Sequence, residues 1–454
     1  MDAGRQPLGV GTGDASAGGP ADPAGARLDV PRLGKDTAAD PLLARFRRVR
    51  ALTAALLAPL SEADATAQSM PDASPAKWHA AHTSWFFDTF LLVGRLGRAH
   101  TRPAWDALFN SYYLGLGRPI HPRPERGLLT RPSLAEVMAW RGEVEAAIEA
   151  VWSRLEAGER AILEIGLAHE EQHQELLLTD LLHLFSRSPL APAFLPPPAG
   201  PQAADPGGPA WLAHPGGLVE VGAGTEGFAF DCERPRHRAW LEPFAVACRP
   251  VTNAEWEAFI ADGGYRTPAL WLSDGWAWVM REGIRAPLHW RGDGQEMTLA
   301  GLQPRLADAP VAHVSQWEAD AFATWAGARL PTEAEWEAMA AGADPEGGNQ
   351  LDGAKTAPRP MPVPGASGPD GNPRPAGLFG DVWEWTASAF TAHPGFRPAP
   401  GLLGEYNGKF MSGQMVLKGG SCATPRGHLR ASYRNFFPAG TRWQFSGLRL
   451  ARDA

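Results

Sequence analysis

The spacing of apolar residues between about residues 41 and 187 constrains the fold of this chain more than any other feature. Apolar side chains recur there every three or four residues in four stretches, as on one face of an amphipathic helix. The stretches begin near residues 41, 74, 133 and 161, with Ser74 and Ser133 in N-cap positions. One irregular segment, at about 99–131, separates the second stretch from the third. This pattern predicts a four-helix bundle over residues 41–187.

The texture of the sequence changes after the predicted bundle. A Pro- and Gly-rich linker over 188–210 leads into short apolar runs that alternate with turns rich in Gly, Pro and Trp. Helical patterns are clear only near 252–262 and 315–328, with a weaker one near 332–342. We therefore expect an α+β domain with little regular secondary structure over 211–454. Residues 1–40 contain no aromatic side chain and much Gly, Ala, Pro and Asp, which predicts disorder.

Charge and composition exclude several classes of protein. Lys and Arg total 42 against 50 Asp and Glu, a net charge of −8, which argues against nucleic-acid binding and binding to anionic membranes. No apolar run approaches the roughly 20 residues that span a bilayer. Three cysteines are too few for a disulfide scaffold, and the N-terminus lacks the pattern of a secretory signal. We expect a soluble cytoplasmic protein, and the sequence leaves its oligomeric state open.

The fourth helical stretch carries His169 and His173, one helical turn apart in the string HEEQH. Two such imidazoles lie on one face and can bind one metal ion. The other residues of that face are mostly apolar, so unbound ring nitrogens there would lack partners. The string also matches the HExxH motif of zinc proteases. The next histidine, His183, lies about 15 Å further along the same helix and cannot complete that site.

A second pair, His79 and His82, lies on the second helical stretch. Taken alone, each is an ordinary core or surface histidine. Bundles, however, build cofactor sites from side chains on facing helices. One member of this pair with the two downstream histidines would give three neutral imidazoles. A divalent metal held this way keeps its charge and has open positions for a thiolate and dioxygen.

The irregular segment between the second and third helices holds two further candidate pairs. Tyr112 and Tyr113 are adjacent, although the chain has only five tyrosines. Arg123 and Arg126 are three residues apart and could hold a carboxylate through paired hydrogen bonds. The alternatives are core packing for the tyrosines and a solvated loop for the arginines.

Together these motifs resemble those of the ergothioneine-biosynthesis sulfoxide synthases, or hercynine oxygenases. That family joins a DinB-like helical bundle to a C-type-lectin-like α+β domain similar to the formylglycine-generating enzyme. The resemblance covers about residues 41–454. In the bundle it rests on three strings: WHAAHT (78–83), HPR (121–123) and HEEQHQE (169–175). In the second half it rests on five: PVTN (250–253), RLPTEAEWE (329–337), GDVWEWT (380–386), KGGS (418–421) and GLR (447–449).

The resemblance implies a mononuclear non-haem iron(II) centre held by His82, His169 and His173. It implies an oxidoreductase that uses dioxygen to join the sulfur of L-cysteine, or of γ-glutamylcysteine, to C2 of the hercynine imidazole. The product is a sulfoxide. The family also uses a tyrosine as a proton or hydrogen donor, and the resemblance places it at Tyr112 or Tyr113.

The resemblance also implies substrate contacts. Arg123 and Arg126 would hold the carboxylate of the sulfur donor, and Gln172, Asn435 and Phe436 would contact hercynine. Branches that use γ-glutamylcysteine have an acidic residue where this chain has Phe437, so free cysteine is favoured here. Aromatic faces would suit the trimethylammonium of hercynine, which cannot donate hydrogen bonds.

Three other functions are the alternatives for a chain with these motifs. A formylglycine-generating oxidase needs a cysteine pair near the C-terminus, and this region contains only Cys422. A DinB-like thiol transferase could bind zinc on the same three histidines. A catalytically degenerate member could bind a small molecule without turnover.

Overall fold

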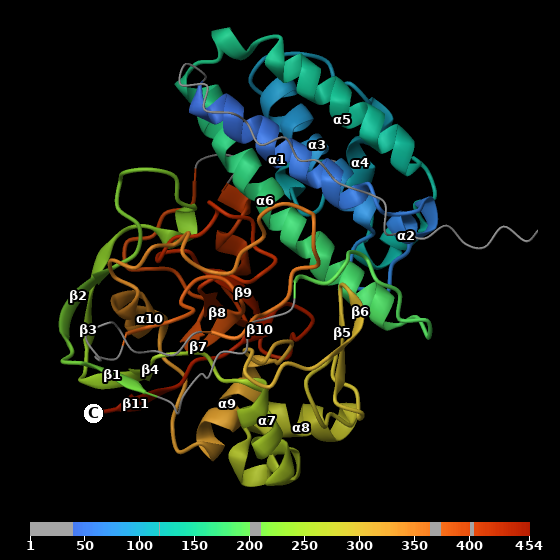
Figure 1. Ribbon diagram of the computed structural model, residues 1–454. Coiled ribbons are helices and arrows are strands. Elements are labelled where there is room, and N and C mark those ends of the chain that lie inside the picture. The colour runs from blue at the N-terminus through green and yellow to red at the C-terminus, as the bar shows by residue number, and fades with distance from the viewer. Residues whose placement is uncertain (1–39, 118, 200–209, 364–373, 400–403) are drawn as a thin grey trace, which may run out of the picture.

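The computed structural model describes residues 40–117, 119–199, 210–363, 374–399 and 404–454. The predicted fold class is confirmed, since a helical first half precedes a second half of short strands, short helices and long loops (Figure 1). Except for Asp40, the segment predicted to be disordered lies outside the described residues.

Four long helices form the bundle, and α6 is the longest of them. They are α1 (Pro41–Leu57), α3 (Ala76–Phe86), α5 (Leu134–Glu149) and α6 (Ala157–Ser186). Helix α3 continues directly as a π-helical segment, η2 (Phe87–Val93). This half also contains two short α-helices, α2 (Glu62–Thr66) and α4 (Asp106–Phe109), and short 3-10 turns. Helix α6 packs on α1 and α3, and α3 also packs on α5.

One predicted helix cap is confirmed and one is wrong. Ser133 caps α5 in a capping box with Glu136. Helix α3 instead begins after Pro75, with no side-chain cap. The backbone N–H of Ser74 donates to Asp180 of α6 at 2.8 Å, and the Ser74 hydroxyl accepts from Arg126. Ser74 therefore forms hydrogen bonds to residues distant in sequence, and it does not cap the helix as the local sequence predicts.

The described residues of the second half contain two small sheets and two two-stranded antiparallel pairs. One sheet has the strand order β1-β4-β11, and the other has the order β10-β7-β8-β9. The strands of the first are β1 (Trp211–His214), β4 (Phe244–Ala247) and β11 (Ala451–Asp453). Those of the second are β7 (Trp383–Ala389), β8 (Gln414–Lys418), β9 (Asn435–Pro438) and β10 (Ser446–Gly447). The two-stranded pairs are β2 (Gly217–Val221) with β3 (His237–Leu241), and β5 (Gln295–Thr298) with β6 (Gly301–Pro304).

Of the four α-helices among the described residues of this half, three were predicted from the sequence. These are α7 (Asn253–Ala261), α9 (Gln316–Trp325) and α10 (Glu333–Met339), each with a capping box. The fourth, α8 (Ser273–Glu282), was missed, and it has no side-chain cap. Among the described residues, no helix is both long enough and apolar enough to cross a membrane.

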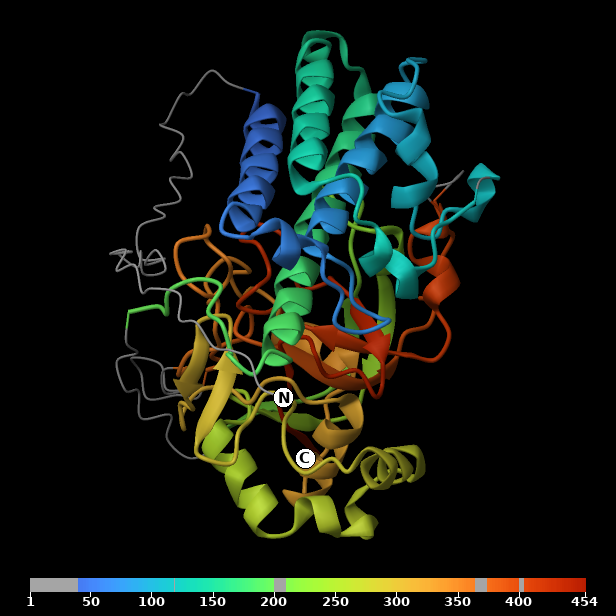
Figure 2. The ribbon, with the colours of Figure 1, turned by 90° about the vertical axis from the view of Figure 1, so that its right-hand side faces the viewer.

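Helix α6 lies at the junction of the two halves (Figures 1 and 2). On its bundle side, the buried Glu170 is paired with Arg50 and Arg141, each at 2.8 Å. On its other side, Glu175 accepts hydrogen bonds from three second-half residues: Trp383, Ser421 and Thr424. Because successive side chains of one helix point to different neighbours, this segment fixes the strands of the second half against the bundle.

Candidate metal centre

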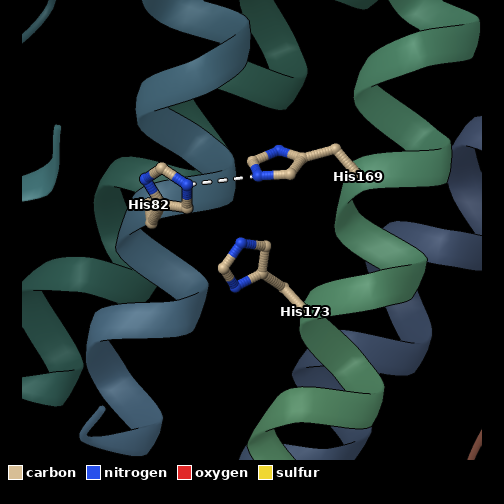
Figure 3. A group of neighbouring side chains, drawn as sticks. All are labelled: His82, His169 and His173. Atoms are coloured by element: carbon tan, nitrogen blue, oxygen red, sulfur yellow. Dashed lines mark hydrogen bonds between the residues drawn. The ribbon is translucent and has the colours of Figure 1, made fainter. Parts of the chain in front are cut away.

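Three histidines from α3 and α6 meet inside the bundle, at its junction with the second half (Figure 3). One ring nitrogen from each of His82, His169 and His173 lies within 4.8 Å of the others. Nε2 of His82 and Nε2 of His169 are 3.1 Å apart. Two nitrogens bound to one ion at about 2.1 Å each can be at most about 4.2 Å apart, so small side-chain rotations would close the set on a metal.

The electrostatics of the three rings suit metal ligands, which must be neutral. Burial lowers the pKa of His169 to about 3 and those of His82 and His173 well below the usual value. The Nδ1–H of His82 donates to the backbone carbonyl of Phe109 at 2.6 Å, which leaves the Nε2 lone pair facing His169. Nδ1 of His169 is buried and has no hydrogen-bond partner in the part of the chain that the structure describes. This donor set fits a divalent metal.

The lowered pKa values predict how the stability of the metal-free protein depends on pH. The unfolded chain takes up protons on its histidines as pH falls through about 6.5, whereas folded His169 stays neutral down to about pH 3. The free energy of unfolding should therefore fall below pH 6.5, with His169 contributing up to about 1.4 kcal/mol per pH unit. Urea unfolding of metal-free protein between pH 4.5 and 7.5 measures this slope. His169→Gln should make it shallower than the matched change His121→Gln; equal slopes would contradict the prediction.

The protease alternative fails on the position of Glu170. In that mechanism the glutamate of the motif must face the cleft as a general base. Here Glu170 is fully buried on the bundle side, and although burial raises its pKa, Arg141 and Arg50 lower the pKa to about 2. A carboxylate held by two guanidinium groups is a poor base. Glu170 also points away from the three histidines, into the bundle.

A cavity of about 640 Å³ opens beside the histidines, between α3, α6 and the second half. His169 and His173 line it, whereas His82 is fully buried behind Trp78, whose ring stacks on it at 4.6 Å. The cavity has room for two small reactants. Most of the residues predicted for the site line it: Tyr112, Arg123, Arg126, His169, Gln172, His173, Asn435, Phe436 and Phe437.

Arg126 is the most unusual charge in the cavity wall. It is 3% exposed, stacks on Trp78 at 3.4 Å, and donates to the hydroxyls of Ser74 and Ser111. Burial, followed by the nearby charge of Arg123, lowers the pKa of Arg126 to about 9, which still leaves it positive at neutral pH. Among the described residues it has no carboxylate within ion-pair distance, and its Nε lacks a partner. A buried, unpaired guanidinium beside a cavity calls for an anionic ligand.

The two predicted tyrosines lie in different environments. Tyr112 lines the cavity and contacts Tyr406 and Phe410. Tyr113 is fully buried, stacks on Tyr112 and packs on Trp85, and its hydroxyl has no hydrogen-bond partner among the described residues.

Sequence reasoning missed Tyr406. Its ring centroid lies 5.6 Å from that of His169, and its hydroxyl donates to Oε1 of Gln172. Nothing local in the sequence around residue 406 identifies it, because it reaches the histidines from the second half of the chain. Burial raises the pKa of both Tyr112 and Tyr406, so both phenols are protonated at neutral pH.

The predicted hercynine contacts come from both halves of the chain, Gln172 from α6 and Asn435 and Phe436 from β9. Gln172 is held between two tyrosines, since it also donates to the hydroxyl of Tyr433 at 2.6 Å. Asn435, Phe436 and Phe437 are the first residues of β9, and Phe436 stacks on Phe390 at 4.0 Å. Gln444, which sequence reasoning missed, also lines the cavity. It is 3% exposed, and neither end of its amide has a partner within the described ranges.

Comparisons with known proteins agree with this two-part construction. Residues 45–177 match the DinB superfamily, and residues 199–359 and 375–454 match the sulfatase-modifying factor enzyme 1-like domain. The formylglycine-generating enzyme of Mus musculus is 29% identical over 250 residues, covering 46% of this chain and 64% of that protein.

Similarity over nearly the whole chain comes from curated proteins named hercynine oxygenase. The protein of Mycolicibacterium thermoresistibile is 35% identical over 423 residues, which covers 87% of this chain and 91% of that relative. The protein of Mycolicibacterium smegmatis is 34% identical over 450 residues, with 93% and 100% covered. Among solved structures, PvdO from Pseudomonas aeruginosa covers 54% of this chain and 95% of PvdO at 18% identity, with a TM-score of 0.36, too low to support an inference.

Proposed function

We propose the following function for this chain, which belongs to the hercynine oxygenase family. It is an oxidoreductase that uses dioxygen to join a thiol sulfur to C2 of the hercynine imidazole, in ergothioneine biosynthesis. The observation that carries the assignment to this site is the cavity of about 640 Å³, which brings a buried three-histidine cluster, an unpaired arginine and an aromatic wall together.

The reaction balances without a further reductant. The C2–H bond of hercynine and the S–H bond of the thiol break, and a C–S bond and an S–O bond form. Dioxygen accepts four electrons, and its two oxygen atoms end on the sulfur and in one water molecule.

We propose that His82, His169 and His173 hold a ferrous ion. Three imidazoles suit iron, zinc, copper and nickel alike, so the choice of iron rests on the family rather than on the donor set. A bound ferrous ion supplies redox chemistry with dioxygen and open positions for substrates. The chain's own contribution is three neutral rings held in place by burial and by the carbonyl of Phe109.

We propose that Arg126, with Arg123 beside it, binds the carboxylate of the sulfur donor. Pairing would offset the cost of burying the Arg126 charge, and the planar guanidinium matches a carboxylate. At Phe437, the wall of β9 presents an uncharged ring to the cavity. Position 437 therefore offers no acidic partner for the distant ammonium of γ-glutamylcysteine, which favours free cysteine.

We place hercynine against the aromatic wall. The faces of Phe410, Phe436 and Tyr406 suit a trimethylammonium group through cation–π contact. Asn435 and Gln172 offer amide groups in the same cavity. Gln172 also holds the hydroxyl of Tyr406, so it orients that phenol beside His169.

Oxygen uptake with defined metals tests the proposed function. Metal-depleted protein is loaded with Fe(II) or Zn(II) without air and given hercynine with cysteine, γ-glutamylcysteine or both. We expect oxygen uptake and a sulfoxide, detected by mass spectrometry, only with iron, and with cysteine preferred. Thiol transfer with zinc and no oxygen uptake would favour the transferase, and hercynine binding without turnover would favour a degenerate member.

Phenylalanine substitutions test which tyrosine donates a proton. We propose the donor among the two tyrosines that line the cavity, Tyr112 and Tyr406, with Tyr113 supporting the ring of Tyr112. Tyr112→Phe and Tyr406→Phe should lower the rate of sulfoxide formation, by about 100- to 10,000-fold for the donor, because a positioned acid typically contributes that much. Stopped-flow or quenched assays measure it. A loss confined to Tyr113→Phe would show that the buried hydroxyl acts instead.

A further inference from the structure

Two buried side chains outside the three-histidine cluster form a hydrogen-bonded line that ends on His173. Nε2 of His79 lies 3.1 Å from Oδ2 of Asp180, and Nδ1 of His79 lies 2.9 Å from Nδ1 of His173. His79 is 3% exposed and Asp180 is 7% exposed. The line runs from α6 to α3 and back to α6 one and a half to two turns away from its start.

The hydrogens along this line can run in only one direction if His79 is neutral. The Asp180 carboxylate accepts only, so Nε2 of His79 carries the hydrogen and its Nδ1 is an acceptor. Nδ1 of His173 must then carry a hydrogen and donate to His79. This leaves the lone pair of His173 on Nε2, and Figure 3 shows the ring nitrogen opposite this contact pointing to the space between His82 and His169.

The carboxylate that starts the line is fixed by the backbone. The N–H of Ser74, just before α3, donates to the same Oδ2 of Asp180 at 2.8 Å. Because one oxygen accepts from both a backbone group and His79, neither the carboxylate nor the His79 ring can turn without losing a buried hydrogen bond.

We propose that Asp180 and His79 are positioning residues that fix the tautomer and the ring orientation of His173, so that its Nε2 faces the metal centre. The inference rests on the proposed function in one respect, that His173 ligates the metal. Outer hydrogen-bond partners of this kind typically change metal affinity by about 10–100-fold.

Paired substitutions at positions 79 and 180 distinguish the effect of the hydrogen bonds from the effect of side-chain packing. Glutamine at position 79 can accept from His173 through Oε1 and donate to Asp180 through Nε2, whereas leucine can do neither. Asparagine at position 180 can turn its amide oxygen to the Ser74 N–H and still accept from His79. His79→Leu and Asp180→Leu should therefore weaken metal binding about 10–100-fold, and His79→Gln and Asp180→Asn should restore it to within a few-fold of the unchanged protein.

Co(II) is the probe, titrated by its absorption into metal-free full-length protein against a competing chelator, with thermal unfolding of the same samples. A purely structural role would shift unfolding temperatures without separating the polar from the leucine variants in affinity. Equal Co(II) affinity in the leucine variants would overturn the inference while leaving the metal centre intact. No Co(II) binding by the unchanged protein would overturn both the metal centre and the inference.

A second measurement needs no variant. Long-range 1H–15N NMR of the metal-free protein, labelled on histidine, reports which ring nitrogen of His173 carries the hydrogen. We expect Nδ1–H for His173 and Nε2–H for His79. The opposite tautomer at His173 would overturn the inference even if every leucine variant failed to fold.

Discussion

Replacing His173 with glutamine is expected to abolish metal binding and sulfoxide formation together. The substitution keeps most of the side-chain volume but removes one of three imidazoles, and an amide is a much weaker ligand for a transition metal. The loss in affinity should exceed the roughly 10–100-fold that follows removal of an outer partner, because a direct ligand is lost. Metal content and oxygen uptake with hercynine and cysteine, measured on one sample, check this.

His183→Gln is the matched control for that experiment. It makes the same change on the same helix, at a ring that meets the hydroxyl of Ser69 and does not line the cavity. It should retain metal and turnover. If His173→Gln keeps full metal content, the three-histidine centre is wrong; if it loses metal yet still forms sulfoxide at the original rate, the metal is not the site of the reaction.

Replacing Arg126 with leucine is expected to weaken binding of the sulfur donor without lowering the free energy of unfolding. A charge-assisted hydrogen bond contributes about 1.5–3 kcal/mol, and loss of one partner of a buried ion pair about 3–5 kcal/mol. The ratio kcat/KM for cysteine should therefore fall by roughly 10- to 4,000-fold, mainly through KM, while KM for hercynine changes little. Steady-state kinetics with each substrate varied in turn separates the two.

Stability distinguishes this role from a structural one. Arg126 forms no ion pair with a described carboxylate, and only the weaker attraction of Asp180 opposes the cost of its burial. Its removal should therefore leave the free energy of unfolding of the substrate-free protein unchanged or slightly higher. Arg141→Leu is the contrast, because Arg141 is paired with Glu170 at 2.8 Å and its loss should destabilise the protein by about 3–5 kcal/mol. If Arg126→Leu instead destabilises the protein and leaves KM for cysteine unchanged, Arg126 is a structural residue and the carboxylate binds elsewhere.

Local pattern in the sequence was enough for the fold class. Apolar residues at helical spacing predicted the bundle, and capping boxes such as Ser133 with Glu136 predicted helix starts, because both depend on neighbours a few residues apart. The spacing of His169 and His173 placed both rings on one face of α6 for the same reason. Where a distant partner competes, local rules fail: Asp180 binds the backbone of Ser74, and Arg126 binds its hydroxyl, so Ser74 is no cap.

The tertiary structure decided which helix faces pack against each other, and therefore which side chains come together. His79 and His82 are three residues apart on one helix, and only the packing of α3 on α6 turns His82 toward His169 and His79 toward Asp180. Tyr406 reaches His169 from 237 residues further along the chain. The sequence by itself therefore determined the helices, their apolar faces and the paired histidines of α6, since these follow from short-range periodicity. Packing between distant segments alone decided the cavity, its unpaired arginine and its second tyrosine, because no local spacing encodes a contact across the chain.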